Sequence, residues 1–378
     1  MSALDGLRVL DLSRLLPGGF CSLLLADFGA DVIKVEDMGM GDYVRAHEPS
    51  FQSLNRGKRS IRIDLKHEAG REAFLRLVRT ADVVLESFRP GVMDRLGVGY
   101  ERLKEEHPRL VYCAITGYGQ DGPYAQRAGH DMNYLALTGL LGLTGEPDGP
   151  PIQAAGQIAD LGGGALMAAF GILAALRERE RSGEGQFVDV SMTDGALSWL
   201  AMVAARYLAE GVVPRRGDPE LAGGLVCYRP YRCVDGWVTF GALEAKFWRA
   251  WCEGVGRPEL AERQFEPVGS DVHREVEGVF AGRTRAEWQA FNDEHDCCLE
   301  PVLDLDEALD SELVRARDMV VEVDGMRLLG TPVKLSRTPA DPTRAGGPPI
   351  GADGEAVLAE AGYTPGEIAA LRETKAVA

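Results

Sequence analysis

The sequence is short of positive charge, because its 41 Lys and Arg residues face 58 Asp and Glu residues and leave a net charge of −17. This balance repels phosphate backbones, so general binding to nucleic acids is not expected. The seven cysteines lack the spacing of a zinc site and are odd in number, so no disulfide framework is expected. Cysteines of this kind predict a reducing, cytoplasmic location.

Long apolar runs are also missing. The longest, around 165–176, is too short and too interrupted by glycine to span a membrane, so no membrane association is expected. The segment 7–12 (LRVLDL) has the pattern of a buried strand and follows no charged leader. No signal peptide is therefore expected.

Common cofactor motifs are absent from the sequence as well. It has no Walker loop, and Gly117-Tyr118-Gly119 lacks the third glycine of a dinucleotide fingerprint. No group of His, Cys and acidic residues has the spacing of a metal site. Neither a nicotinamide cofactor nor a metal ion is expected.

The first half of the chain alternates between predicted strands and predicted helices. The strands are expected at 8–12, 30–35, 60–65, 83–86, 110–116 and 186–190. The helices are expected at 18–28, 68–79, 100–106, 160–180 and 194–209. This alternation predicts an α/β fold with a parallel, doubly wound sheet, whose sites lie at the carboxyl ends of the strands.

A length of 378 residues favours two domains. Composition shifts at the charged, glycine-rich segment 214–224, and a β-hairpin with an Asp235-Gly236 turn is expected at 226–243. Helices are expected at 246–255, 271–280 and 285–294. We predict a large domain at 1–215 and 325–378 and a smaller α+β domain at 220–320. An extended arm at 338–354 precedes a last helix capped by Thr364.

His130 is the first candidate for chemistry. A lone histidine is as often structural as functional, but this one follows Ala128-Gly129 in a loop after the predicted strand 110–116. Asp131 and Asn133 could fix its tautomer. The other five histidines lie in polar, charged segments that suggest solvated surfaces.

Asp160 is the second candidate. An aspartate directly before a helix is commonly a cap, and a helix start would depress the pKa of its carboxyl group. Three glycines follow at 162–164, which suggests close approach of the backbone to another chain or a ligand. Their N–H groups could also stabilise an oxyanion. Together, His130 and Asp160 could supply two bases to opposite faces of one carbon atom.

A basic run at 55–66 holds five cations and one anion, against the charge of the whole chain. It predicts either a solvated edge strand or a site for a phosphate-bearing ligand. Arg89, just past a predicted strand end, could join such a site. Glu244 stands between a predicted strand and helix, where glutamate is ordinary.

Nearly the whole chain resembles the family III CoA-transferases (CaiB/BaiF superfamily). The segments that carry the resemblance are LLLADFGADV (23–32), NRGKRS (55–60), ESFRPGV (86–92), GYGQDGP (117–123), GEGQ (183–186) and SMTDG (191–195). This resemblance implies a Rossmann-like large domain, a small domain and an interlocked homodimer. It also implies an acyl-CoA thioester as substrate, with coenzyme A as part of that substrate and no other cofactor.

Within this family, the segment RAGHDMNY (127–134) is similar to that of the α-methylacyl-CoA racemases. The similarity implies three catalytic residues, His130, Asp160 and Glu244, with Glu244 as the partner of the histidine. It also implies CoA and acyl contacts from Arg62, Ile63, Asp64, Leu65, Glu86, Arg89, Gly129 and Tyr134.

Two departures from the racemase pattern stand out. Gly156 replaces an asparagine four residues before the aspartate. The second strand ends in Glu36-Asp37 instead of Asp-Arg, and an acidic residue cannot contact the adenosine as arginine does.

Three functions follow from these residues. The chain is expected to be an acyl-CoA 2-epimerase that works through an enolate, with His130 and Asp160 as its bases. The alternatives are a CoA-transferase with Asp160 as nucleophile, and an acyl-CoA-binding protein without chemistry. A transferase needs only the aspartate, so the pair of His130 and Glu244 favours the epimerase.

Overall fold

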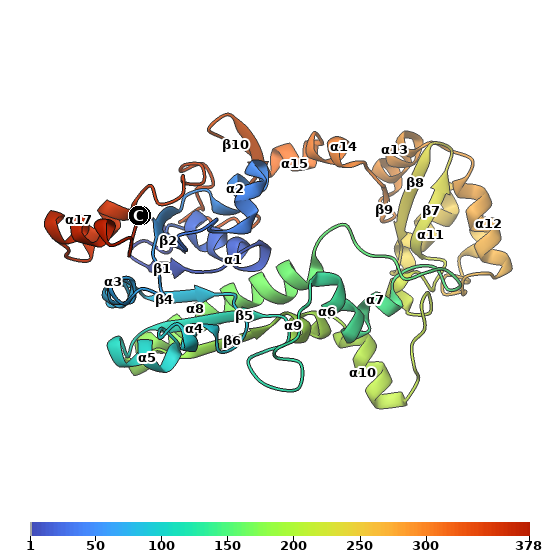
Figure 1. Cartoon of the computed structure of the whole chain (residues 1–378). Helices are drawn as coiled ribbons and strands as arrows, with labels where there is room; N and C mark the ends of the chain where they lie inside the picture. Colours follow the sequence, from blue (N-terminus) through green and yellow to red (C-terminus); the bar gives the residue numbers. More distant parts are fainter. Residues whose placement is uncertain (1) are drawn as a thin grey trace. The chain divides into compact units, whose positions relative to one another are not determined.

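The computed structural model describes residues 2–378 and consists of two compact units (Figure 1). The first contains the described part of Met1–Thr138 together with Ala154–Trp199 and Glu312–Ala378. The second contains Gly139–Gln153 and Leu200–Ser311. The sequence analysis had placed 139–153 and 200–215 with the large domain and 312–320 with the small one. Here the first two segments group with the second unit, and 312–320 groups with the first unit.

The first unit contains a six-stranded sheet with the order β3-β2-β1-β4-β5-β6, and all its strands are parallel. This confirms the predicted parallel, doubly wound sheet. The strand order reverses between β1 and β4, which is where ligands bind in folds of this class. The six strands are β1 (Arg8–Asp11), β2 (Asp31–Glu36), β3 (Arg59–Arg62), β4 (Val83–Glu86), β5 (Val111–Thr116) and β6 (Phe187–Ser191).

Helices cover both faces of this sheet (Figure 1). On one face α1 (Leu16–Asp27) and α8 (Met167–Ser182) contact the strands and each other. On the other, Leu10, Ile33 and Val84 share a core with α3 (Glu68–Val78) and α5 (Tyr100–Glu106). The remaining helices of this unit are η1 (Tyr43–Ala46), α2 (Glu48–Asn55), α4 (Val92–Arg95), α6 (Asp131–Thr138), α9 (Met192–Ser198), α15 (Glu312–Ala316), α16 (Gly354–Glu360) and α17 (Pro365–Glu373).

The helix predicted at 160–180 begins earlier and has two parts. A π-helical segment η2 (Ile158–Leu166) leads directly into α8. Within residues 2–378, Ile158–Ser182 is the one helix whose length and composition would let it cross a membrane, so the sequence analysis underestimated this apolar stretch. Its buried residues Ala168 and Ile172 belong to the part that packs on β5 and β6, as in the core helix of a folded domain.

A buried charge network fixes the carboxyl end of β1. The Asp11 carboxylate is fully buried and lies 3.4 Å from Lys58 Nζ and 3.9 Å from Lys34 Nζ. It also accepts hydrogen bonds from the hydroxyl groups of Ser13 and Ser22. Burial alone would raise the pKa of Asp11, but the two lysines and the two hydroxyls outweigh it and lower that pKa. Asp11 is therefore held as a carboxylate in the interior.

The second unit contains the predicted hairpin, β7 (Tyr228–Cys233) and β8 (Gly236–Gly241), extended by a third antiparallel strand, β9 (Leu299–Pro301). Trp248, Trp251 and Trp288 are fully buried against this sheet. The helices of this unit are α7 (Leu140–Leu143), α10 (Ala201–Glu210), η3 (Glu220–Ala222), α11 (Ala245–Gly254), η4 (Pro258–Leu260), α12 (Asp271–Phe280), α13 (Arg285–His295) and α14 (Leu305–Leu309).

The C-terminal part of the chain returns to the first unit. After the hairpin β10 (Val320–Val323) and β11 (Met326–Leu329), the predicted arm at 338–354 contains no strand and no helix before α16. It packs back on the first unit, where the Gly57 N–H donates to the Ala345 carbonyl at 2.8 Å and the Asp341 N–H donates to the Asp27 carbonyl at 2.7 Å. The last helix starts as predicted, with Thr364 and Glu367 forming a capping box.

The glycines after Asp160 allow η2 and α9 to approach closely. A Cβ atom on Gly163 would lie 2.6 Å from the Met192 carbonyl oxygen, and one on Gly195 would overlap the Gly163 carbonyl oxygen. The close approach that the sequence suggested is therefore real, but the neighbour is another helix of the same chain.

This crossing predicts that Gly195→Ala destabilises the protein. Because backbone atoms of both helices would have to separate, we expect a loss of about 1–3 kcal/mol in the free energy of unfolding, the usual range for overpacking. Gly278→Ala is the matched control, since this glycine lies in α12 with open space around its Cα. We expect the control to gain about 0.5–1 kcal/mol from helix propensity. Denaturant unfolding measures the stability of both variants. Equal stabilities of Gly195→Ala and Gly278→Ala would contradict the claim that the close contact between η2 and α9 requires glycine.

Candidate active site

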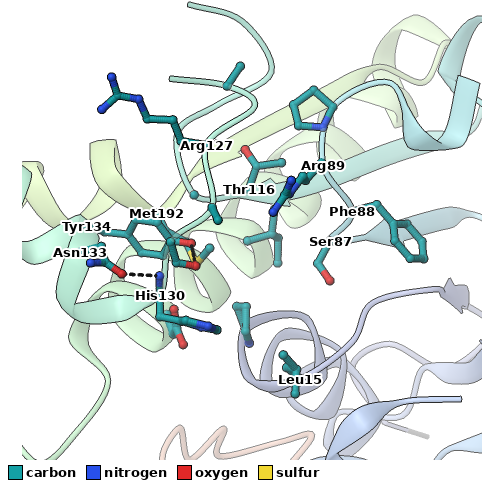
Figure 2. Close-up of a pocket in the computed structure, with 18 of the residues that line it drawn as sticks. Leu15, Ser87, Phe88, Arg89, Thr116, Arg127, His130, Asn133, Tyr134 and Met192 are labelled. Carbon is teal, nitrogen blue, oxygen red and sulfur yellow. Dashed lines mark hydrogen bonds between the residues drawn. The ribbon is translucent and has the colours of Figure 1, made fainter. Parts of the chain in front are cut away.

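A cavity of about 430 Å³ lies at the carboxyl ends of β4, β5 and β6, next to the loop after β1 (Figure 2). In Figure 2, His130, Asn133, Tyr134 and Met192 lie on one side of the cavity, and Ser87, Phe88 and Arg89 lie on the other. Asp160 also lines it. The structure therefore brings both sequence-predicted bases, His130 and Asp160, to the edge of the sheet where sites are expected.

His130 ends the loop that follows β5 and is exposed in the cavity. Its backbone N–H donates to Asn133 Oδ1 at 3.0 Å, directly before α6 begins (Figure 2). Asn133 thus holds the backbone of His130 instead of its ring. The prediction that Asn133 and Asp131 fix the tautomer is not supported, because the hydrogen bonds of both side chains go to backbone amides.

Two glycines shape the cavity wall next to His130. The Tyr134 hydroxyl donates to the Gly129 carbonyl at 2.6 Å. A Cβ atom at either Gly117 or Gly129 would lie 2.6 Å from the ring of Tyr134. Both positions therefore need glycine so that the tyrosine can close against the loop.

Asp160 lies in the first turn of η2 and does not cap it, because the capping position is Gln157. The Asp131 carboxylate fixes this turn: its Oδ1 accepts from the N–H of Ala159 at 2.6 Å and from the N–H of Asp160 at 3.0 Å. Asp131 is buried, and its Oδ2 has no hydrogen-bond partner among residues 2–378. One side chain at the start of α6 therefore positions the helical turn that carries Asp160.

The sequence-based expectation of a depressed pKa for Asp160 is wrong. The pKa of Asp160 is raised to about 6, chiefly by burial and in addition by the negative charge of Asp131, while His130 opposes the shift. The effect of the helix start is outweighed because the carboxyl group loses water and has a second carboxylate as neighbour. The influence of His130 also shows that the two candidate bases lie within electrostatic reach of each other.

The proposed oxyanion donors after Asp160 are not available as expected. The Leu161 N–H donates to the Gln157 carbonyl at 2.9 Å. The three glycines that follow are buried, where Gly162 faces Trp199 and Gly163 and Gly164 face Met192. This part of the prediction is corrected, because the glycines serve the packing of η2 against α9.

A second cavity of about 580 Å³ lies at the carboxyl ends of β1, β2 and β3. Of the residues expected to contact CoA, Ile63, Asp64 and Leu65 line this cavity, and Arg89, Gly129 and Tyr134 line the first one. The two cavities share Arg14 and Phe88.

Two expected CoA contacts, Arg62 and Glu86, line neither cavity. Arg62 donates to the carbonyls of Met38 and Gly39. Glu86 is buried and accepts from the Phe88 N–H at 2.6 Å, and burial raises its pKa to about 7. Both residues therefore support loops beside the cavities.

The basic run fits neither of the two predictions made for it. β3 is an edge strand, but Arg56 forms a buried ion pair with Asp27 at 2.7 Å, and Arg59 pairs with Asp31 at 2.6 Å. Lys58 is buried next to Asp11. Most of these cations hold the first unit together, and Lys66 is the one cation of this run that lines either of the two cavities.

Glu244 belongs to the second unit, where it is the capping residue of α11 and is exposed. Its predicted pairing with His130 stays a prediction. Among residues 2–378, no group of three or more His, Cys, Asp and Glu side chains is placed to hold a metal ion.

Comparisons with known proteins agree with this geometry. The model of CoA-transferase family III matches residues 4–354. The chain is 38% identical to alpha-methylacyl-CoA racemase of Mus musculus, over 99% of this chain and 97% of that one. It is also 38% identical to succinyl-CoA:mesaconate CoA-transferase of Haloarcula marismortui, over 90% and 92%. A solved CAIB/BAIF family protein from Brucella suis superposes with a TM-score of 0.84 at 32% identity, covering 95% of this chain and 99% of that one.

The geometry around Asp160 predicts the effect of Asp131→Asn. The asparagine oxygen can still accept both N–H groups, so only the charge is lost, and the pKa of Asp160 should fall below its value of about 6. The measurement is a ¹³C NMR titration of aspartate-labelled protein, with the Asp160 signal assigned from Asp160→Asn. Asp121→Asn, an exposed charge in the loop after β5, is the control. An unshifted midpoint in Asp131→Asn would refute the electrostatic coupling.

Proposed function

This chain belongs to CoA-transferase family III, and from that premise we propose that it is an acyl-CoA 2-epimerase. The observation that carries the proposal is that His130, at the end of the loop after β5, and Asp160, in the first turn of η2, line one cavity. Family membership makes an acyl-CoA thioester the expected substrate. The thioester carbonyl makes the proton on C2 removable, because the resulting charge is delocalised onto oxygen as an enolate.

In the proposed reaction, one of the two residues takes the C2 proton and the other returns a proton to the opposite face. When Asp160 is the base, the C–H electron pair moves into the enolate, and a protonated His130 donates its proton to C2. When the opposite enantiomer enters, neutral His130 takes the proton and protonated Asp160 returns one. No redox change occurs and no co-reactant is consumed.

The raised pKa of Asp160 supports this role over that of a simple nucleophile. A group that must act as base in one direction and as acid in the other works best with a pKa near the operating pH. At about 6, the pKa of Asp160 lies close to neutral pH, so this carboxyl group can serve as base in one direction and as acid in the other. A carboxylate nucleophile reacts only in its ionised form, and a raised pKa lowers the fraction of that form.

The start of α6 is the better candidate for stabilising the enolate oxygen. The first N–H groups of a helix lack acceptors within the helix and carry a partial positive charge. Here these are the amides of Asp131 and Met132, directly after His130. This replaces the donors that were expected after Asp160.

A CoA-transferase that works through Asp160 is the second candidate. Transferases and racemases match this chain at the same identity, 38%, so relatedness alone does not separate them. In a transferase, the Asp160 carboxylate would attack the thioester and form a covalent acyl intermediate. His130 would then have no direct role in bond making.

We further propose that the protein is a homodimer, in which Glu244 of one chain orients His130 of the other. The support is an uncovered apolar face on the first unit. Leu166, Phe170 and Leu173 follow helical spacing along Ile158–Ser182, and Phe170 is 72% exposed. Exposed apolar residues in such a row are typical of a protein interface.

The epimerase proposal predicts deuterium exchange at C2. Wild-type protein in deuterated water should interconvert the 2R and 2S forms of a 2-methylacyl-CoA and incorporate solvent deuterium. His130→Ala and Asp160→Asn should each lose interconversion by about 10²-fold or more, the usual contribution of an acid–base group. Each variant could still exchange one enantiomer through its remaining base. Mass spectrometry and chiral separation of the acyl group give both readouts.

The control for this experiment is His47→Ala, because His47 is exposed, bonds to Ser50 and lies outside both cavities. It should behave like the wild type. A mild His130→Ala variant, an acyl-Asp160 adduct trapped by hydroxylamine and rapid transfer of CoA to a free acid would instead identify a transferase.

The dimer proposal predicts that Phe170→Glu dissociates the protein. Sedimentation should give twice the mass of the chain for the wild type and a shift toward the single chain for the variant, because a charge would be buried in an apolar interface. Arg181→Glu is the control, since Arg181 is 83% exposed on the same helix but at its polar end. A wild type that sediments as a single active chain would refute the dimer.

A further inference from the structure

Arg14 lies where the two cavities of the first unit meet. It lines both of them together with Phe88. Arg14 follows β1 and Phe88 follows β4, the two strands between which the strand order reverses. A ligand that extends from one cavity into the other must therefore pass these two side chains.

The guanidinium group of Arg14 is held from several sides. Its Nη2 lies 2.6 Å from Asp37 Oδ2, and its Nη1 donates to the Tyr43 hydroxyl at 3.0 Å. It also lies 5.1 Å from the ring centre of Tyr43 and 5.4 Å from that of Phe88. The side chain is 26% exposed, so a solute can reach it.

The backbone around Arg14 is fixed as well. Leu15 has φ 62° and ψ −149°, a conformation that residues other than glycine rarely adopt. Its N–H donates to Asp42 Oδ1 at 2.9 Å, while Lys34 Nζ donates to the Ser13 carbonyl at 3.0 Å. The Arg14 N–H itself donates to Ser87 Oγ at 3.0 Å. The position of the arginine is therefore set before a ligand arrives.

The charges that line the second cavity single out the pair of Arg14 and Asp37. The cations in its lining are Arg14 and Lys66, and the acidic residues are Glu36, Asp37, Asp42 and Asp64. Glu36 is engaged by Arg45 at 2.6 Å and Asp42 by Lys34 at 2.7 Å, and both carboxylates are buried. Asp37 is 46% exposed, so an incoming anion can replace it as the partner of Arg14.

We propose that Arg14 binds the pyrophosphate of coenzyme A at the junction of the two cavities, and that it leaves Asp37 to do so. The inference rests on the proposed function in one respect, namely that the ligand is an acyl-CoA. The pyrophosphate joins the nucleotide of CoA to its pantetheine arm. If the thioester lies beside His130 and Asp160 and the adenosine lies in the second cavity, the pyrophosphate lies between them, at Arg14. Guanidinium groups bind phosphate oxygens with two parallel hydrogen bonds. Asp37 is then the partner of Arg14 when no ligand is bound.

The test is calorimetric titration of wild-type protein and Arg14→Gln with CoA and with 3′-dephospho-CoA. Both ligands carry the pyrophosphate, so the variant should weaken both by the same factor, about 10- to 100-fold, the range for losing a hydrogen bond to a charged group. Binding should also depend less on salt. Arg8→Gln is the matched control, because Arg8 is 22% exposed, pairs with Asp31 and Glu360 and lies at the opposite end of β1. Its affinity should equal that of the wild type.

A second variant tests the exchange of partners. Asp37→Asn keeps an oxygen for the N–H groups of Gly39 and Gly41 but removes the competing charge, so it should bind CoA more tightly. A loss of affinity as large as that of Arg14→Gln would show that Asp37 supports the ligand site and would overturn the exchange. Thermal unfolding of each variant verifies its fold, and Arg14→Lys, which keeps the charge but not the forked donors, should bind with intermediate affinity.

Other outcomes would overturn the assignment itself. An effect of Arg14→Gln on CoA but not on 3′-dephospho-CoA would place the 3′-phosphate at Arg14 instead. Unchanged affinity for both ligands, or a wild type that binds neither, would refute the inference. A protein that loses CoA affinity in Arg14→Gln but shows no C2 exchange would retain this inference and refute the proposed epimerase, so the two failures can be told apart.

Discussion

The arrangement of both cavities depends on the interactions of the buried Asp11 carboxylate with two lysines and two hydroxyl groups. A fully buried carboxylate is costly unless cations and hydrogen-bond donors surround it. Here those groups come from four segments: Lys34 from β2, Lys58 from the approach to β3, Ser22 from α1 and Ser13 from the loop after β1. The network fixes these segments at the point where the strand order reverses.

Through Lys34, this network also fixes the backbone next to Arg14, a residue that lines both cavities. Lys34 also pairs with Asp42, which accepts the Leu15 N–H and so holds the strained turn next to Arg14. A residue in an unfavourable backbone conformation persists only where its surroundings over-determine it. The unusual turn is therefore a consequence of the buried charges behind it, and its result is a cation placed between two cavities.

A second carboxylate organises the other side of the candidate site. One oxygen of Asp131 accepts hydrogen bonds from two amides of the helical turn that carries Asp160, and the charge of Asp131 helps to raise the pKa of that residue. Asp131 thus both positions Asp160 and contributes to its raised pKa. Because Asp131 directly follows His130 in the chain, the start of α6 positions both His130 and the helical turn that carries Asp160, which brings these two residues to one cavity.

Much of the site could be predicted because its residues occur in short segments at strand ends. His130, Asp160, Arg89 and Tyr134 were expected there, and they do line one cavity. Arg62 and Glu86 were expected beside the ligand, but their side chains turn to backbone groups of neighbouring loops. A segment's place in a parallel sheet follows from its order in the chain, whereas the direction of a side chain depends on partners that are remote in sequence.

The sequence by itself determined the alternation of strands and helices, the parallel sheet, the hairpin of the second unit and the capped last helix, because periodicity and local turn chemistry decide these features. Only the tertiary structure decided which charged side chains are buried or paired and how their pKa values shift. It buried Lys58 and paired Arg56 and Arg59, although the run that contains them looks like a ligand site. It also raised the pKa of Asp160, where local reasoning predicted the opposite. Burial and the charge of neighbours control both outcomes, and neither is known until distant segments have come together.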